Sequence, residues 1–430
     1  MSDCFQRNAE VLQRRWPTLF TRLLAEDSQS IRAEQVTGKG ATLSIDGIQL
    51  TSRHDRFAEA RLQAASLPLA SSIAHVYGTG LGDVQRVLLE RSDLNRLQVH
   101  ILNGALFKLI LEQFDQVDWL SEPRVELSYA VDDREIRLPF FALPSELELA
   151  DELNAKIRDR LVSEVHLNFN NREFNPQSPQ ILKRLKASLQ LLRSDRNVTE
   201  LFGSQAGREI YVIGTGPSLE QQFEKLKVIR AQSPRPLFIS VDTAYRPLME
   251  QGIKPDMVVS IDQRITALHL PSEQSDKIPL VYMPLSNPKV LRAWKGWRYA
   301  SYSASPIYRN MREKNDRGEL YVGGSVIHPA VDLAVKMGAA QITLFGADFA
   351  FPMNKTHASW KDGELGPGVN LARHWVLDGR GQRVKTQLNF RRYLSELERY
   401  IAKHPQVSFF NSSREGAMIA GTRFNPEFTQ

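Results

Sequence analysis

Cysteine is nearly absent from this sequence, since Cys4 is the only one in 430 residues. A single cysteine excludes an intramolecular disulfide and a cysteine-based zinc site, which leaves His, Asp and Glu as the strong metal ligands. No run of about 18 apolar residues occurs, so no transmembrane helix is expected. The first residues, MSDCFQRNAEVLQRRWP, lack the apolar core of a secretory signal. These absences predict a cytoplasmic protein.

A strong charge bias is lacking as well. The 55 basic and 49 acidic residues give a formal charge of +6, and the basic residues are scattered rather than gathered in runs with aromatic side chains between them. This pattern argues against a nucleic-acid-binding protein, while the small positive excess favours anionic ligands. With 42% hydrophobic and 24% charged residues, the composition is typical of a globular protein with two or three domains.

The sequence does contain two stretches in which short apolar strands alternate with helices. Ahead of them, residues 1–70 hold an amphipathic helix interrupted at Pro17 and a hairpin around Asp46-Gly47, which we expect to form an N-terminal appendage. Three further segments are expected: a Rossmann-like domain at 71–165, a linker and bracing helix at 166–202, and a second Rossmann-like domain at 203–430. The predicted fold class is α/β with two doubly wound domains.

The first of these stretches leads a strand, IAHVY, into Gly78, Gly80 and Gly82 and then into a helix. Glycines at such a turn let the backbone approach a nucleotide or S-adenosylmethionine, but a tight turn without a ligand has the same pattern. The next strand ends at Asn103, where a ribose-binding domain usually carries an acidic side chain. Whether the first domain binds a cofactor therefore stays open.

The second stretch contains EIYVIGTGPSLEQQFEKLKVI. It predicts a strand, a glycine turn and a helix that begins with Pro217, because proline suits the first helical position. We expect the backbone N–H groups and the Ser218 hydroxyl at this helix start to point outward and bind an anion. The turn lacks the lysine of a Walker A motif, so it is not the usual P-loop of an NTPase.

Three carboxylates end three later strands of the same domain: Asp242, Asp262 and Asp348. Ligands of open α/β sheets bind beyond the carboxyl ends of the strands, so these side chains are candidate ligand contacts. An Asp at such a position also commonly caps the following helix or turn. After Asp348 comes a long polar stretch without a sustained period, which predicts a functional loop. His357 in that loop is a candidate general base, although a surface histidine is more often simply solvated.

Several separated motifs of the chain resemble one family in the same order: HVYGTGLG, DWLSEPRVELSY, GTGPSL, GIKPDMVVSID, VGGSVIHPAVDLAVKMGAAQITLFGADFAF, KTHA and NSSREGAMIAGTRF. They resemble the motility accessory factor (Maf) family of bacterial flagellin glycosyltransferases. The central domain of that family is MptE-like and similar to that of CMP-sialic acid sialyltransferases. The resemblance implies transfer of a nonulosonic acid from a CMP-activated donor to Ser or Thr of flagellin, a step needed for flagellar assembly and motility.

The resemblance also implies roles for individual residues. Those expected around the nucleotide and the sugar are Gly214, Thr215, Gly216, Pro217, Ser218, Asp242, Asp262, Gly323, Gly324 and Ser325. The expected catalytic residues are His357 and Asp348, and Arg373 or Lys355 would pair with the sugar carboxylate. The sialyltransferases have asparagines where this chain has Asp242 and Asp262. Because carboxylates there can bind ribose hydroxyls or a divalent cation, the need for a metal stays open.

Two alternatives remain. The central domain also resembles the MptE-like 6-hydroxymethylpterin diphosphokinases, which would use ATP with Mg²⁺ held by Asp242 and Asp262. In the second alternative, the chain binds flagellin without catalysing a reaction. The large N-terminal domain argues against the first alternative, and the intact motifs of the second domain argue against the other.

Overall fold

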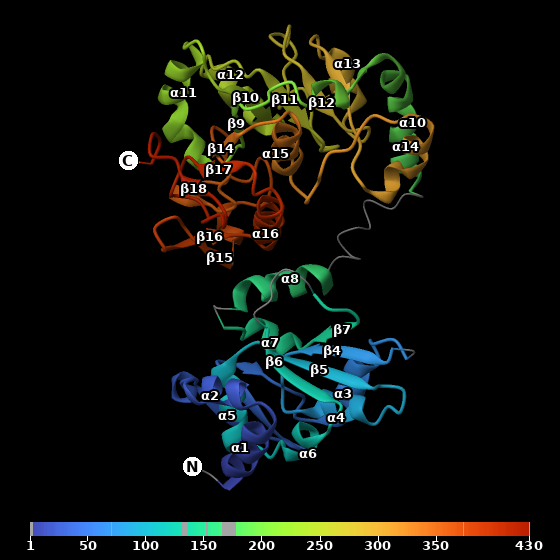
Figure 1. Ribbon diagram of the computed structural model, residues 1–430, viewed down its shortest axis with the longest axis vertical. Coiled ribbons are helices and arrows are strands. Elements are labelled where there is room, and N and C mark those ends of the chain that lie inside the picture. Colours follow the sequence, from blue (N-terminus) through green and yellow to red (C-terminus); the bar gives the residue numbers. More distant parts are fainter. Residues whose placement is uncertain are drawn as a thin grey trace. The chain divides into compact units, whose positions relative to one another are not determined.

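The computed structural model describes residues 3–69, 71–130, 136–151, 154–165, 178–372 and 374–429. The chain divides into two compact units, Met1–His166 and Leu167–Gln430, which Figure 1 labels element by element. Each unit contains a parallel β-sheet with helices packed against it. The predicted α/β fold class is confirmed.

The first unit begins with two helices, α1 (Asp3–Arg15) and α2 (Pro17–Leu24). The predicted interruption at Pro17 is confirmed, because proline starts the second helix instead of continuing the first. A three-stranded antiparallel sheet follows, made of β1 (Ala33–Thr37), β2 (Ala41–Ile45) and β3 (Ile48–Gln49). Asp46 and Gly47 both have positive φ, as a type I′ turn requires. Strand β1 was not predicted.

The predicted separate appendage is instead part of the core of the first unit. Leu12 of α1 and Leu23 of α2 are buried in the same apolar cluster as Val76 and Val99 of the parallel sheet. An amphipathic helix must bury its apolar stripe, and helix α1 does so against α5 (Gly104–Gln113). Residues 1–70 therefore complete the first unit.

The parallel sheet of the first unit has the strand order β6-β5-β4-β7. Its strands are β4 (Ile73–Tyr77), β5 (Arg96–Ile101), β6 (Val125–Tyr129) and β7 (Phe140–Ala142). Its further helices are α3 (Arg56–Ala64), α4 (Asp83–Leu89), α6 (Val117–Ser121), α7 (Pro144–Glu148) and α8 (Ala155–Val165).

The second unit contains a nine-stranded sheet in the order β18-β17-β14-β9-β10-β11-β12-β13-β8, and every pair in it is parallel. Its strands are β8 (Arg196–Asn197), β9 (Glu209–Ile213), β10 (Leu237–Val241), β11 (Met257–Ser260), β12 (Leu280–Tyr282), β13 (Arg298–Ala300), β14 (Gln341–Phe345), β17 (Ser408–Asn411) and β18 (Arg423–Phe424). Parallel strands buried on both faces read as nearly continuous apolar runs, which is why the sequence predicts most of them.

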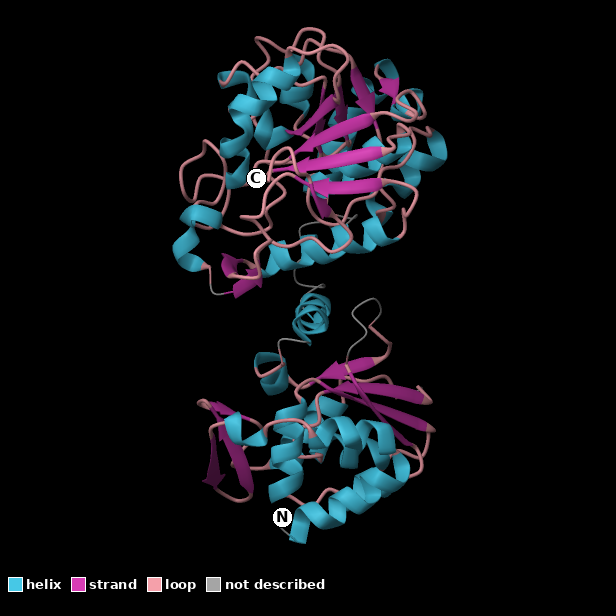
Figure 2. Ribbon diagram, turned by 60° about the vertical axis from the view of Figure 1, so that its left-hand side comes forward, coloured by secondary structure: helices cyan, strands magenta, loops and turns pink. Residues whose placement is uncertain are grey.

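The helices of the second unit lie on both sides of this sheet (Figure 2). They are α10 (Pro179–Ser194), α11 (Phe223–Arg230), α12 (Asp242–Glu250), α13 (Pro288–Ala293), α14 (Arg309–Lys314), α15 (Ile327–Lys336) and α16 (Leu388–Ala402). From β9 the chain winds through α11 and α12 toward β13, and then returns through α15 to β14 on the other side of β9. This path makes the unit doubly wound.

Two local expectations are wrong. The helix expected at Pro217 begins as a 3₁₀ turn, η5 (Pro217–Gln222), and only becomes α-helical at α11. The long stretch after Asp348 was expected to be a loop, but it contains an antiparallel hairpin of β15 (His374–Leu377) and β16 (Arg383–Thr386). Both strands are only four residues long and only partly buried, and the polar residues around them hide the short apolar run of β15.

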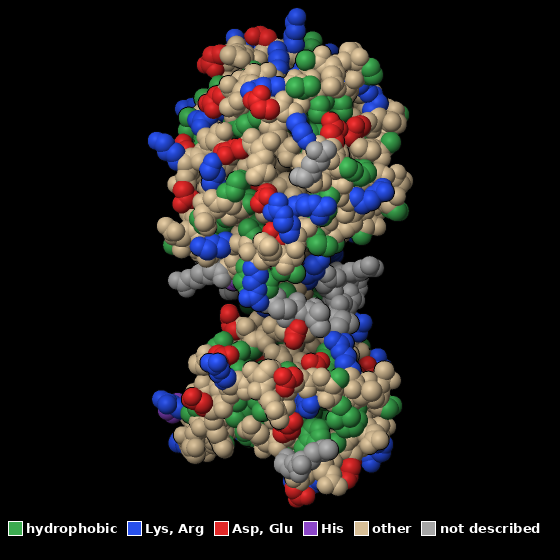
Figure 3. Space-filling view, turned by 90° about the vertical axis from the view of Figure 1, so that its left-hand side faces the viewer, with side chains coloured by type: hydrophobic (Ala, Val, Ile, Leu, Met, Phe, Trp, Pro, Cys, Tyr) green, Lys and Arg blue, Asp and Glu red, His purple; other side chains and the backbone are tan. Residues whose placement is uncertain are grey.

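No described helix is both long and apolar enough to cross a membrane. On the face shown in Figure 3, basic and acidic side chains are interspersed over both units. That mixture of charges is the surface counterpart of the scattered basic residues in the sequence.

Candidate functional site

The loops after β9 and β14 meet at the point where the winding direction of the second sheet reverses. Strand β9 leads to β10 on one side, whereas β14 pairs with it on the other. Ligands of open α/β sheets bind in the crevice beyond the strands at such a switch point. The Gly214 and Gly216 N–H groups donate to the carbonyls of Phe345 and Gly346 at 2.8 and 2.7 Å, which joins the two loops.

Glycine is required where these loops touch. A Cβ atom at Gly216 would lie 2.4 Å from Asp348 Oδ2 and 2.6 Å from the Gly346 oxygen. Gly346 has a φ of +56°, and its own Cβ would lie 2.6 Å from the Gly214 oxygen. Larger residues at these positions would push the loops apart, so the glycines of this turn serve the close contact of two backbones.

Asp348 binds the residue that was expected to hold a phosphate. Its Oδ2 accepts from the Ser218 N–H at 2.8 Å, and its Oδ1 accepts from Ser218 Oγ at 2.5 Å. Burial raises the pKa of Asp348 to about 6, and the two hydrogen bonds from Ser218 partly oppose this rise. The expectation that both donors of Ser218 point outward as an anion site is therefore wrong, because a carboxylate of the protein occupies them.

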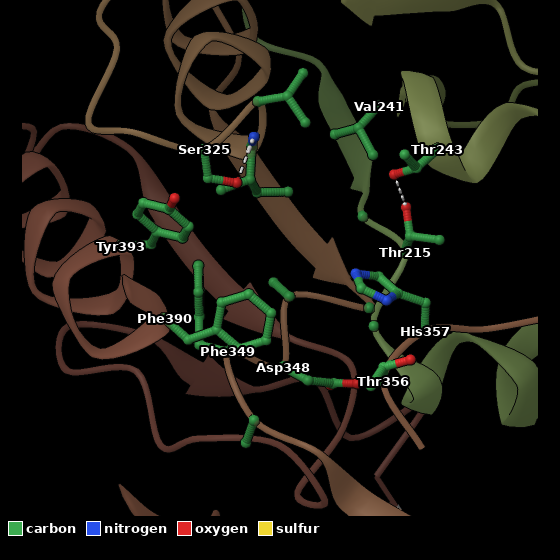
Figure 4. Close-up of a pocket in the computed structure, with 17 residues that line it drawn as sticks. Thr215, Val241, Thr243, Ser325, Asp348, Phe349, Thr356, His357, Phe390 and Tyr393 are labelled. Carbon is green, nitrogen blue, oxygen red and sulfur yellow. Dashed lines mark hydrogen bonds between the residues drawn. The ribbon is translucent and has the colours of Figure 1, made fainter. Parts of the chain in front are cut away.

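A cavity opens beside this contact and contains about 540 Å³ of empty space, part of it open to solvent. Figure 4 shows Phe390 and Tyr393 on one side of it, with His357 and Thr215 across from them. The lining residues are Gly214, Thr215, Gly216, Val241, Thr243, Ser325, Val326, Ile327, Gly346, Ala347, Asp348, Phe349, Ala350, Thr356, His357, Phe390 and Tyr393. Six predicted site residues are thus brought together: Gly214, Thr215, Gly216, Ser325, Asp348 and His357.

Two residues of the cavity wall each contain a buried polar atom without a hydrogen-bond partner in the described part of the chain. Thr356 Oγ1 and His357 Nδ1 are buried, and neither has a hydrogen-bond partner among the described residues. Burial lowers the pKa of His357 to about 4, so its imidazole is neutral at pH 7. A neutral imidazole with a free nitrogen can accept a proton from a hydroxyl group.

The third turn predicted for the site contributes one residue to the wall. Ser325 lines the cavity, whereas Gly323 packs against Glu396 and His328. Gly324 has a φ of +104°, and a Cβ there would lie 2.6 Å from Tyr393 Cε1. Gly323 and Gly324 are therefore needed for close packing of this turn, and they do not face the cavity.

The two other carboxylates lie outside the cavity lining. Asp242 is 1% exposed, and its Oδ1 accepts from the Thr243 N–H at 2.8 Å. Burial is the main cause that raises its pKa to about 7, and the charge of Asp262 adds to the rise. Asp262 is more exposed and accepts from the Arg264 N–H at 2.7 Å. The capping alternative considered from sequence describes Asp262, whereas Asp242 is the first residue of α12, makes no cap hydrogen bond, and has a buried Oδ2 without a partner among the described residues.

The sequence leaves a divalent cation at Asp242 and Asp262 open. Within the described part of the chain, no group of three or more His, Cys, Asp or Glu side chains is placed to hold a metal ion.

Of the two expected partners of a sugar carboxylate, Lys355 is not among the residues that line the cavity. Lys355 Nζ lies 2.6 Å from Glu220 Oε2. The prediction for Lys355 is therefore wrong in this geometry, because its ammonium group is already paired with the carboxylate of Glu220. Arg373 lies outside the described residues.

Sequence reasoning missed part of the wall. Thr243, Phe349, Thr356, Phe390 and Tyr393 all line the cavity. Tyr393 lies in the apolar pattern of α16, which predicts burial and gives no sign of a cavity. Thr356 stands next to His357 in the KTHA motif, and that neighbourhood is the one sequence signal that could have identified it.

A side chain of the first unit, Glu146, binds the glycine turn after β4. Glu146 Oε1 accepts from Thr79 N–H at 2.8 Å and Thr79 Oγ1 at 3.2 Å, and it also accepts from the Gly80 N–H. Glu146 is 1% exposed, and burial raises its pKa to about 7. It belongs to α7, which follows β7, the neighbour of β4 at the switch point of this sheet. A carboxylate of the protein therefore fills the place where a phosphate would bind.

Asn103 also has a structural role. Its Oδ1 accepts from the Leu106 N–H at 2.9 Å at the start of α5, and its amide donates to the Leu149 carbonyl at 2.7 Å. The residue is thus a helix cap, which agrees with the tight-turn alternative for this domain.

Known proteins resemble parts of this chain. The family model of MptE-like 6-hydroxymethylpterin diphosphokinases matches residues 183–354. A 6-hydroxymethyl-7,8-dihydropterin pyrophosphokinase from Pyrococcus furiosus is 29% identical over 175 residues, which are 38% of this chain and 65% of that protein. The chain thus spans less than two thirds of the length of this relative.

A solved structure of a Maf glycosyltransferase from Magnetospirillum magneticum AMB-1 is 16% identical and has a TM-score of 0.46. That similarity covers 99% of this chain and 74% of the other. The predicted resemblance to MptE-like proteins is confirmed for the central part of the chain, residues 183–354.

Proposed function

We propose that the protein is a glycosyltransferase that moves a nonulosonic acid from a CMP-activated donor to Ser or Thr of flagellin. The observation that carries the proposal is that Thr356 and His357 line the switch-point cavity, while Thr356 Oγ1 and His357 Nδ1 are buried without a hydrogen-bond partner among the described residues. Both belong to the KTHA motif, which lies beyond the region 183–354 that matches the diphosphokinases. The identities of the donor and the acceptor in this proposal come from the ordered motifs that resemble the Maf family.

The proposed chemistry needs a base for the acceptor. The acceptor oxygen attacks the anomeric carbon, the bond from that carbon to the phosphate oxygen breaks, CMP leaves, and the acceptor proton moves to the imidazole of His357. A weak base is sufficient because the sugar carries developing positive charge as the leaving group departs. With a pKa of about 4, the imidazole is neutral at pH 7, and one of its two ring nitrogens can accept a proton.

The other walls suit a nucleotide-linked sugar. Figure 4 shows Ser325 on the same side of the cavity as the rings of Phe390 and Tyr393, with Thr215 across from them, and the Thr215 hydroxyl is hydrogen-bonded to that of Thr243 at 2.5 Å. In this proposal the Gly214–Gly216 backbone approaches the donor, while Asp348 holds the turn in place through Ser218. Flagellin as acceptor and a cytoplasmic location are parts of the same proposal.

The second candidate is a pterin diphosphokinase that uses ATP and Mg²⁺. The family model and the Pyrococcus furiosus relative favour it. Against it, Asp242 and Asp262, the carboxylates assigned to Mg²⁺, lie outside the cavity lining. A protein that only binds flagellin, the third candidate, would have no use for an unpartnered imidazole in a cavity.

A binding panel followed by a transfer assay tests the proposal. Thermal unfolding is measured with CMP, CMP-sialic acid, ATP with Mg²⁺, and S-adenosylmethionine. A compound present at about 100 times its Kd adds roughly 2.7 kcal/mol of stability. Stabilisation by the CMP compounds, followed by sugar transfer to purified flagellin detected by intact mass, is the expected result. Stabilisation by ATP with Mg²⁺ alone would replace the proposal by the diphosphokinase. An unchanged unfolding temperature with every compound would favour the flagellin-binding protein.

A further inference from the structure

The segment that carries Thr356 and His357 is fastened across the glycine turn. The Ala358 N–H donates to the Thr215 carbonyl at 2.8 Å, which ties the middle of the segment to that turn. On one side Lys355 pairs with Glu220, and on the other Trp360 binds α12. We call residues 355–360 the KTHASW segment.

Glu220 makes two of these contacts. Its Oε2 lies 2.6 Å from Lys355 Nζ, and its Oε1 accepts from the Ser359 N–H at 2.8 Å. It stands in η5, two residues after Ser218. One carboxylate therefore holds both flanks of the pair formed by Thr356 and His357.

Trp360 fixes the far end of the segment. Its indole N–H donates to the Thr243 carbonyl at 3.0 Å. The Arg246 guanidinium lies 3.7 Å from the centre of its ring, and His269 stacks on it with 5.2 Å between the ring centres. A ring held by three partners and buried to 7% exposure leaves the end of the segment little freedom.

The backbone of this region is strained. Met353, Asn354 and Ser359 have φ angles of 56°, 53° and 57°, which are uncommon for residues other than glycine. Such angles persist only where the surroundings enforce them, and they gather at functional sites. Glu220 is the side chain that binds the amide of one of these residues, Ser359.

We propose that Glu220 is a positioning residue that holds the KTHASW segment so that Thr356 and His357 line the cavity. This inference rests on the proposed function for the role of His357, whereas the fastening itself can be measured without substrate. The ion pair with Lys355 is half exposed and contributes little. The bond from the Ser359 N–H to a carboxylate is the stronger contact.

Hydrogen exchange of the full chain tests the fastening. We compare the amides of residues 355–360 in wild type, Glu220→Ala, Lys355→Ala and the control Glu224→Gln, whose side chain is exposed and pairs only with Lys227. The expected result is exchange about tenfold or more faster in Glu220→Ala, because an amide loses a charged acceptor. Smaller changes are expected in Lys355→Ala, and none in the control. Unchanged exchange in Glu220→Ala at an unchanged Tm would overturn the inference.

Kinetics then separate positioning from simple destabilisation. With CMP-sialic acid as the donor probe, Glu220→Ala should lower kcat about tenfold or more and leave the Kd of CMP within about twofold, since the segment presents the base and not the donor turn. Glu220→Gln keeps an acceptor for the Ser359 N–H and should recover most of kcat. Equal loss in both variants would contradict the inference.

The outcomes also separate this inference from the proposed function. Faster exchange in Glu220→Ala together with no transfer from any CMP donor would overturn the proposed function and leave the fastening in place. Transfer by wild type with unchanged exchange and kcat in Glu220→Ala would overturn only the positioning role.

Discussion

Asp348 and Ser218 lie 130 residues apart in the chain and are joined by two hydrogen bonds. The contact holds the loop after β14 against the loop after β9, at the switch point of the second sheet. Because both side chains are buried, each depends on the other for its hydrogen bonds. The candidate site is therefore built on an internal contact between a carboxylate and a turn.

Replacing Asp348 separates the shape of this contact from its charge. Asp348→Ala leaves two buried donors of Ser218 without an acceptor and should reduce the free energy of unfolding by about 2–4 kcal/mol. Asp348→Asn keeps an oxygen for the Ser218 N–H and an amide for its hydroxyl, so it should cost less than about 1.5 kcal/mol. Urea unfolding at pH 7 measures both. Equal losses in the two variants would mean that the negative charge itself holds the turn.

His357 is expected to act as a neutral base. His357→Ala should lower the transfer rate by about 10²-fold or more while CMP binding is kept. Because burial lowers the pKa of His357 to about 4, the fall in kcat/KM that depends on His357 should be centred near pH 4, below any change from Asp348, whose pKa is about 6. A fall in kcat/KM centred between pH 6 and 7, absent from His357→Ala, would show that the imidazole is not desolvated as described.

The sequence predicts the sheet of the second unit well, and it predicts the region of the site. Strands β9, β10, β11 and β14 are short apolar runs, and parallel strands of a doubly wound sheet need little else in order to be recognised. Since ligands of such sheets bind at the carboxyl ends of strands, the turn after β9 and Asp348 after β14 could be assigned to one place.

The direction of individual side chains could not be predicted. Asp242, Asp262 and Asp348 all follow strands, but only Asp348 lines the cavity. The difference depends on partners that are distant in sequence, such as Ser218 for Asp348, or next in sequence, such as Thr243 for Asp242. Ser218 itself looked like a free anion donor because nothing in its neighbourhood indicates a carboxylate 130 residues later.

The burial of Glu146 at the glycine turn of the first unit predicts that the free energy of unfolding falls as the pH rises. The folded pKa of Glu146, about 7, lies above the ordinary value of 4.5, so the folded state binds more protons than the unfolded state between these values. Its contribution is complete below pH 4.5 and is lost as the pH rises through 7. Glu146→Gln keeps an acceptor for Thr79 and Gly80 but cannot ionise. At pH 8 it should be more stable than wild type by up to about 3 kcal/mol.

Calorimetry of the full chain from pH 4 to 8 checks this prediction. The stability difference between Glu146→Gln and wild type should shrink toward zero below pH 4.5. A stability difference between Glu146→Gln and wild type that stays constant from pH 4 to 8 would mean that the pKa of Glu146 is the same in the folded and unfolded states.

A histidine pair in the same unit has the opposite pH dependence. His75 Nδ1 lies 3.2 Å from His100 Nε2, and His100 Nδ1 lies 3.0 Å from Ser128 Oγ. Burial is the main cause that lowers the pKa of each to about 4. The unfolded state therefore binds more protons between pH 4 and 6.5, and stability is lost as the pH falls through this window.

Variants of this pair reveal the effect as a slope. In His100→Gln, the loss of unfolding free energy between pH 6.5 and 4 should be smaller than in wild type, whatever the stability at pH 7. His54→Gln is the control, because His54 is exposed in the same unit. Urea unfolding at four pH values measures the slopes, and equal slopes in all three proteins would contradict the prediction.

Gly216→Ala tests whether the site needs the close contact of its two loops. The added Cβ would lie 2.4 Å from Asp348 Oδ2 and 2.6 Å from the Gly346 oxygen, so the loops must separate, at a cost of about 1–3 kcal/mol. Separation also moves the wall at Thr215, and we expect stabilisation by CMP to disappear. In the control Gly40→Ala, the new Cβ meets its nearest atom, Arg56 Cδ, at 3.5 Å. Wild-type stability together with wild-type CMP binding in Gly216→Ala would show that the loops are not held together as described.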